Sequence, residues 1–193
     1  MARAPLSAVD VEPAAPLAGT GVSALSWSAV IGGTVAAIAV TLTLLALGSA
    51  FGLATISPWP GLGAKPTSFT IGAGIWLVVT QWLSAALGGY IAGRLRVRWT
   101  GLHTDEVFFR DTAHGFLTWA TATVIMAVVS VLAVAMTRAA APAVDVNATK
   151  EAVDAARKVT ATFAAFTGLS LVIGAFIGSV CGAIGGRLRD LHN

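Results

Sequence analysis

The string GYIAGRLR (residues 89–96) recurs as GAIGGRLR (residues 182–189), and six of the eight positions are identical. Each copy closes an apolar stretch that is long enough to cross a bilayer, because about 20 mostly apolar residues suffice for a spanning helix. The repeat therefore predicts two copies of one membrane hairpin, each ending in glycine and arginine.

The composition supports a membrane protein. Hydrophobic residues make up 56% of the 193 residues and charged residues only 11%, whereas a soluble domain carries about 25% charged residues. Four stretches satisfy the length rule for a spanning helix, and none of them contains Asp, Glu, Lys, Arg or His: residues 30–53, 70–91, 116–136 and 163–184. This pattern predicts an integral membrane protein with four transmembrane helices and excludes a soluble domain.

The Lys and Arg residues are distributed unequally between the two sides of the predicted membrane. Seven of the twelve fall in the N-terminal tail, the middle loop and the C-terminal tail, and five fall in the two hairpin loops. Arg94, Arg96, Arg187 and Arg189 stand directly at the ends of spans, where the positive-inside rule counts most. The distribution predicts that both termini and the middle loop are cytoplasmic.

The repeat extends beyond its closing string. A shift of 93 residues superposes Arg94 on Arg187, and a shift of 92 superposes Trp27 on Trp119. Each half then consists of a tryptophan, a span, a loop and a returning span, so the two copies have the same orientation and are related by an axis along the membrane normal. The expected fold is all-α, a four-helix bundle with approximate two-fold symmetry.

The expected segments follow from these boundaries. They are a disordered cytoplasmic tail (1–25), the first transmembrane hairpin (26–96), a cytoplasmic loop with an interfacial helix (97–115), the second hairpin (116–189) with a polar outer helix (144–160), and a cytoplasmic tail (190–193). We expect the outer helix to run on into the fourth span and to project above the membrane.

Glycines recur at every fourth position of the last span and face one side of the helix. They are Gly174, Gly178, Gly182 and Gly186, and Gly89 and Gly93 match them in the second span. Glycine at this spacing lets helix backbones approach closely in lipid. The pattern predicts tight helix packing, within the bundle in the first place, with packing between subunits and a pore lining as alternatives.

Few polar groups lie inside the predicted spans. Because ionisable residues within a membrane usually mark proton relays and ion-coupled transporters, their absence from these sequences argues against such machinery. The hydroxyl groups can bond to backbone carbonyls one turn away, so Gln81 is the polar residue of note. We expect its amide to form an interhelical hydrogen bond rather than to contact a substrate.

The densest polar stretch, residues 103–115, lies in the middle loop. Its candidate interaction residues are His103, Asp105, Glu106, Arg110, Asp111 and His114. One interpretation is an interfacial helix with carboxylates in its first turn, docked on Arg94 or Arg187 through Asp105, Glu106 or Asp111. The alternatives are a partner-binding or ligand site, or a metal or proton-handling site built from His103, Asp111 and His114.

No catalytic motif is present: the sequence lacks a nucleophile elbow, a Walker loop, an HExxH pair and a dinucleotide fingerprint. We therefore expect no enzyme, no metal and no cofactor. The basic residues lie at span ends, where they suit membrane lipid, so no nucleic-acid partner is expected. The single cysteine, Cys181, is expected to be a small packing residue.

The stretch 103–118, together with the two GRLR endings, resembles a group of small four-span membrane proteins from alphaproteobacteria, some of which carry the label "PhnA-like". The resemblance covers most of residues 26–190 and implies the bacterial inner membrane and no established activity. The label itself finds no support here, because the chain lacks the cysteine pairs of a zinc ribbon. The nine Arg against three Lys fit a GC-rich bacterium.

The sequence is compatible with three classes of function. The leading prediction is a structural or interaction protein, either a homo-oligomer or an accessory subunit of a membrane complex. The alternative is a small channel or carrier along the pseudo-two-fold axis, which requires several polar side chains to converge there: Thr34, Thr41, Gln81, Ser84 and Thr123. An enzyme acting on lipid is third, and it requires His103, Asp111 and His114 to meet in one pocket.

Overall fold

The structure is a computed structural model of the chain, and it describes residues 23–57, 63–97, 103–140 and 149–191. These residues form four helices: α1 (Trp27–Thr55), α2 (Pro66–Leu95), α3 (Thr104–Ala140) and α4 (Lys150–Leu191). Each helix contains one predicted span and is long and apolar enough to cross a membrane. The all-α fold with four transmembrane helices is confirmed, and the protein is a multi-pass membrane protein.

The turn between α1 and α2 follows from local chemistry. Pro66 is the first residue of α2, where its missing N–H costs nothing because no intrahelical acceptor exists there. Gly63 has a φ of +104°, which only glycine adopts without strain, and it forms an antiparallel bridge with Ile56. The chain therefore reverses direction directly after α1 ends at Thr55.

One segment that we predict as a separate helix is continuous with its span, and the polar outer helix, which we expect to run on into the fourth span, is continuous with it. Residues 104–115, predicted as an interfacial helix, are the first turns of α3. Residues 150–160 of the predicted outer helix are the first turns of α4, and its residues 144–148 lie outside the described chain. The predicted tail at 1–25 and the loop residues 98–102 also lie largely or wholly outside it.

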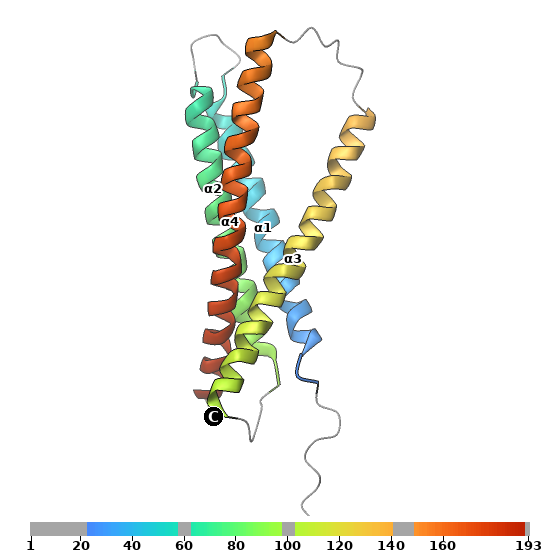
Figure 1. Cartoon of the computed structure of the whole chain (residues 1–193), viewed down its shortest axis with the longest axis vertical. Helices are drawn as coiled ribbons and strands as arrows, with labels where there is room; N and C mark the ends of the chain where they lie inside the picture. The colour runs from blue at the N-terminus through green and yellow to red at the C-terminus, as the bar shows by residue number, and fades with distance from the viewer. Residues whose placement is uncertain (1–22, 58–62, 98–102, 141–148, 192–193) are drawn as a thin grey trace, which may run out of the picture.

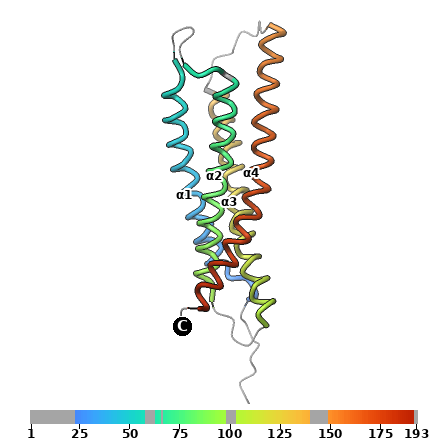
Figure 2. Tube along the Cα trace, turned by 90° about the vertical axis from the view of Figure 1, so that its left-hand side faces the viewer, coloured from blue at the N-terminus to red at the C-terminus, as the bar shows by residue number. Residues whose placement is uncertain are grey.

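The helices alternate in direction, as Figures 1 and 2 show. α2 and α4 end, and α1 and α3 begin, at the lower end of Figure 1. We call this the charged end, because Arg96, Asp111, His114 and Arg189 lie there, and we call the opposite end the open end. Since both GRLR strings stand at the charged end, the two hairpins have the same orientation.

The two halves are not packed identically. α2 contacts each of the other three helices, and α3 does so as well, whereas no contact joins α1 to α4 among the described residues. A strict two-fold axis would make the α1–α4 contact equivalent to the α2–α3 contact. α2 packs most extensively against α4 and then against α1, and less against α3, so the bundle is built around α2.

Small residues allow the helices to touch at the charged end. A methyl group at Gly93 would meet the carbonyl oxygen of Gly182, and one at Gly89 or at Gly115 would meet that of Gly178. The stripe on α4 thus faces α2 on one side and α3 on the other, within the same chain. The buried apolar side chains are correspondingly small: Ala29, Val30, Ala37, Ala85, Ala92, Ala122 and Ala183.

The bundle opens toward its other end. In Figure 1 the second half of α3 leans away from the remaining helices, whereas the first half of α4 still reaches α2, with Phe166 against Gly74. Residues 127–139 of α3 are all exposed, so no face of this segment packs against the chain. The contacts that hold the bundle together are concentrated at the charged end.

Candidate functional site: buried charges and an apolar pocket

A buried ion pair joins α2 to α3 at the charged end. The Nε of Arg96 donates a hydrogen bond to Oδ1 of Asp111, and both residues are only 2% exposed. Arg96 also donates through Nη1 to the carbonyl oxygen of Val97, at 2.9 Å. Two opposite charges are thereby removed from solvent together, which is the arrangement that buried ions require.

The partner of Asp111 is not one of the predicted arginines. Arg94 and Arg187, which we expected to bind the carboxylates of residues 103–115, are exposed, and Arg96 holds Asp111 instead. The reason is helical phase, because residues spaced by three or four share a face. Arg96 lies on the same face of α2 as Gly93. Arg94 directly follows Gly93, so its side chain points about 100° away from that face.

The same phase applies to the second string. Arg189 continues the face of Gly182 and Gly186 and turns inward, where its Nη1 donates to the carbonyl oxygens of Gly93 (3.1 Å) and Arg96 (3.0 Å). Its Nη2 donates to both carboxylate oxygens of Asp190, at 2.9 and 3.0 Å. Arg189 therefore satisfies carbonyls at the end of α2 that have no partner within that helix.

Glycine makes room for the buried carboxylate. A methyl group at Gly186 would overlap the Asp111 carboxylate, and one at Gly182 would lie 2.6 Å from the Asp111 carbonyl oxygen. The lower end of the glycine stripe thus has a second consequence besides close helix packing. It lets an acidic side chain of α3 sit between α2 and α4.

His114 joins the start of α1 to α3. The backbone N–H of Ser26 donates to Nε2 of His114 at 2.8 Å, so Nε2 carries a lone pair rather than a proton. Nδ1 lies 2.6 Å from the carbonyl oxygen of Arg110 and must be the protonated nitrogen. The imidazole is 1% exposed, and its two bonds require the neutral form with the proton on Nδ1.

The remaining polar residues of the middle stretch do not join this cluster. His103 and Asp105 are exposed, and Glu106 accepts a hydrogen bond from Arg110 at 2.6 Å, one turn away on α3. Within the described chain, no three His, Cys, Asp or Glu side chains gather closely enough to hold a metal ion. The meeting of His103 with Asp111 and His114, which a metal or catalytic site required, is therefore not found.

Most hydroxyl groups inside the membrane donate to a carbonyl oxygen of their own helix, as Thr43, Thr121 and Ser179 do, but two of them join neighbouring helices. Thr34 of α1 donates to the carbonyl oxygen of Thr118 on α3 at 3.4 Å, and Thr41 of α1 donates to the hydroxyl of Ser84 on α2 at 2.9 Å. Gln81 lies between helices too, since its side chain stands against Gly174 of α4. Thr34, Thr41, Gln81 and Ser84 are four of the five polar residues that the pore alternative requires.

The helices pack closely at two levels of the bundle, around Gly33 and around Gly178. A methyl group at Gly33 of α1 would meet the carbonyl oxygen of Gly88 on α2 and lie 2.9 Å from the side chain of Thr118. At the next level, the backbones of Gly89 and Gly115 both lie against Gly178. At both levels, three helices of the bundle pack directly against one another.

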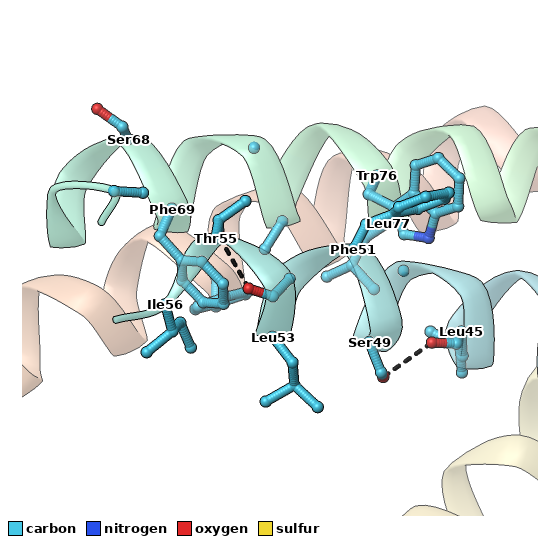
Figure 3. A pocket seen from close by; sticks show the side chains of 16 residues that line it. Leu45, Ser49, Phe51, Leu53, Thr55, Ile56, Ser68, Phe69, Trp76 and Leu77 are labelled. Atoms are coloured by element: carbon cyan, nitrogen blue, oxygen red, sulfur yellow. Dashed lines mark hydrogen bonds between the residues drawn. The ribbon is translucent and has the colours of Figure 1, made fainter. Parts of the chain in front are cut away.

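An apolar pocket of about 700 Å³ lies at the open end between α1 and α2 (Figure 3). Phe51 of α1, Phe69 and Trp76 of α2 and Phe163 of α4 are among the residues that line it. The rings of Phe51 and Trp76 meet edge to face, with centroids 6.2 Å apart. Pockets of this size and composition are the usual form of sites for apolar ligands or partner side chains.

Three polar side chains at the wall of this pocket are already hydrogen-bonded. The hydroxyl groups of Ser49 and Thr55 donate to carbonyl oxygens of their own helix, each at 2.8 Å. The indole N–H of Trp76 donates to the carbonyl oxygen of Leu44 at 2.9 Å, and Gly48 provides the space for the ring. The pocket therefore selects by shape and apolar contact rather than by hydrogen bonds.

Comparison with known proteins adds no family to this geometry. No family model matches the chain, and neither a curated protein nor a solved structure matches it. The resemblance to small four-span alphaproteobacterial proteins stays a prediction.

Proposed function

We propose that the protein is a structural or interaction protein rather than an enzyme, and that it forms a homo-oligomer through its open end. The proposal rests on one observation, the exposure of residues 127–139 of α3 on every face of the helix. The remainder of the bundle is held together by glycine contacts and by the buried charges of the charged end, so this segment is available for another chain.

The chemistry of the exposed segment suits a helix partner. Ala127, Ser130, Val134 and Thr137 share one face of α3 at helical spacing. The hydroxyl groups of Ser130 and Thr137 donate to carbonyl oxygens of their own helix, at 2.7 and 3.0 Å. The side chains of this face are therefore compact, and its hydroxyl groups are already hydrogen-bonded. In lipid, such surfaces associate by close packing.

The apolar pocket is the surface we assign to the partner's α3. Ser26 and His114 are hydrogen-bonded and mark one level of the bundle. Nineteen residues further along each helix, at a rise of about 28 Å, α1 reaches Leu45 at the start of the pocket and α3 reaches Ala133. The exposed segment of one copy and the pocket of another thus lie at similar depth in the membrane.

The proposed location is a bacterial inner membrane with both termini in the cytoplasm. The support is the arginine distribution, since Arg94, Arg96, Arg187 and Arg189 all stand at the charged end, and the positive-inside rule places such ends in the cytoplasm. The alternative of transport through one chain has less support, because α1, α2 and α3 pack closely around Gly33, and α2, α3 and α4 pack closely around Gly178.

The test is the native mass of the full chain, extracted in mild detergent, for wild type and two matched variants. Val134→Trp changes a residue on the proposed contact face, and Val35→Trp changes a residue of α1 that is similarly exposed, at 62% against 50%. We expect a homo-oligomer for wild type and for Val35→Trp, and a monomer for Val134→Trp. A monomeric wild type would contradict the proposal, and so would a stoichiometric foreign subunit, which would indicate an accessory protein instead.

A further inference from the structure

A second apolar concavity, a groove of about 340 Å³, lies on the outside of the bundle between α3 and α4. Phe108 of α3 and Phe176, Val180 and Ile184 of α4 line it, and Arg187 is the last residue of α4 along its wall. These apolar side chains are between 37% and 67% exposed, so the groove faces the surroundings of the bundle rather than its interior.

The inner wall of the groove offers no free hydrogen-bonding group. The hydroxyl group of Thr112 donates to the carbonyl oxygen of Phe108 at 2.8 Å, and that of Ser179 donates to the carbonyl oxygen of Ala175 at 2.7 Å. Both polar side chains on the wall are therefore satisfied by their own helices. The occupant of the groove must be apolar along this part of its length.

The length of the groove corresponds to one leaflet of a bilayer. Phe176 and Arg187 are 11 residues apart on one helix, which is about 16 Å along the axis. Half of a hydrocarbon core of about 30 Å is about 15 Å. An acyl chain that extends from the bilayer midplane to the headgroup level therefore spans the groove.

The charge lies at the headgroup end. Arg187 is exposed, and it has no ion-pair partner among the described residues. Two other arginines of the charged end are engaged, Arg96 with Asp111 and Arg189 with Asp190. A guanidinium without a carboxylate partner at the membrane surface is suited to bind phosphate oxygens.

We propose that this groove is a specific site for one anionic phospholipid. Its acyl chain lies along Val180 and Ile184, its phosphate binds Arg187, and the ring of Phe108 packs at the headgroup level. The site goes beyond the proposed oligomer, because it lies on the α3–α4 face near the charged end, away from residues 127–139.

The internal repeat provides a matched control for the experiment. Arg94 is the counterpart of Arg187 and is also exposed, but it does not line the groove. The delipidated full chain is mixed with equal amounts of phosphatidylglycerol and phosphatidylcholine, and the bound lipids are counted by native mass spectrometry on each oligomeric species separately. We expect one retained phosphatidylglycerol per chain, with about fivefold preference over phosphatidylcholine.

Three variants decide the outcome. Arg187→Gln should reduce the preference to about one, Arg94→Gln should leave it unchanged, and Val180→Trp should remove the retained lipid of either kind. Equal losses in Arg187→Gln and Arg94→Gln would show only general surface attraction and would overturn the site, as would undiminished retention in Val180→Trp. Because Arg187 is exposed, its variant reports on binding even if Val180→Trp does not fold.

Discussion

Removing one charge of the Arg96–Asp111 pair should be more harmful than removing both. The pair is buried, with side-chain exposures of 0% and 3%, and Gly186 of α4 covers the carboxylate. Asp111→Leu keeps the number of side-chain heavy atoms but leaves the guanidinium of Arg96 without its carboxylate. Arg96→Met leaves the carboxylate without its cation, and the double variant leaves neither charge.

The expected magnitudes follow from the cost of an uncompensated buried charge. Each single variant should lower the free energy of unfolding by about 3 to 5 kcal/mol, whereas an apolar pair of similar volume is often neutral or better. The double variant should therefore be more stable than either single one, with a coupling energy of about 3 kcal/mol or more. A coupling of about 3 kcal/mol corresponds to more than a hundredfold in the unfolding equilibrium constant.

The assay is reversible unfolding in mixed detergent micelles, followed by far-ultraviolet circular dichroism, for wild type, both singles and the double variant. The control is the same cycle on Glu106 and Arg110, a partly exposed pair one turn apart on α3 with side chains 44% and 21% exposed. That pair should couple by only about 0.3 to 0.5 kcal/mol. Equal coupling in the two cycles, or additive losses at Arg96 and Asp111, would refute the reasoning.

Three further changes test the charged end and its surroundings. Gly186→Ala should lower the free energy of unfolding by about 1 to 3 kcal/mol, because the added methyl group overlaps the carboxylate of Asp111; a wild-type unfolding curve would show that the helices separate there. Gly168→Ala, with nothing within 4 Å of the new methyl group, should instead be neutral or stabilise by up to about 1 kcal/mol through helix propensity, and a loss comparable to that of Gly186→Ala would contradict the packing argument. His114→Phe removes the acceptor for the Ser26 amide. Hydrogen exchange of that amide should become about tenfold faster, because the lost hydrogen bond contributes about 1 kcal/mol or more. Unchanged exchange would mean that the bond does not hold the start of α1.

The sequence predicts the spans well because the governing physics is local. An apolar stretch without charges is driven into lipid as a helix whatever the rest of the chain does, and each predicted span lies inside one observed helix. The common direction of the two hairpins follows from the number of spans. Two spans per half return the chain to the side of the membrane on which it began. The start of α3 is less predictable, since residues 104–115 continue the helix beyond the span, where polarity alone does not end a helix. Residues 150–160 do the same in α4, and there the helical spacing of their charges indicates the continuation.

The partner of the buried carboxylate could have been predicted more sharply. The prediction pairs the carboxylates with the first arginine of each string, Arg94 or Arg187. In the structure the second arginine of each string, Arg96 or Arg189, turns inward. The spacing from Gly93 to Arg96 and from Gly186 to Arg189 is the signal, because it places each second arginine on the glycine face.

The sequence alone thus determined that this is an all-α membrane protein with four spans, arranged as two hairpins in the same direction, because hydrophobic length and repeat spacing are properties of short segments. Only the tertiary structure decided that Arg96 pairs with Asp111, that α1 and α4 do not touch, and that the second half of α3 stands free. These features depend on the tilt and rotation of helices set by contacts between distant segments. Packing in lipid determines those angles, and no single segment encodes them.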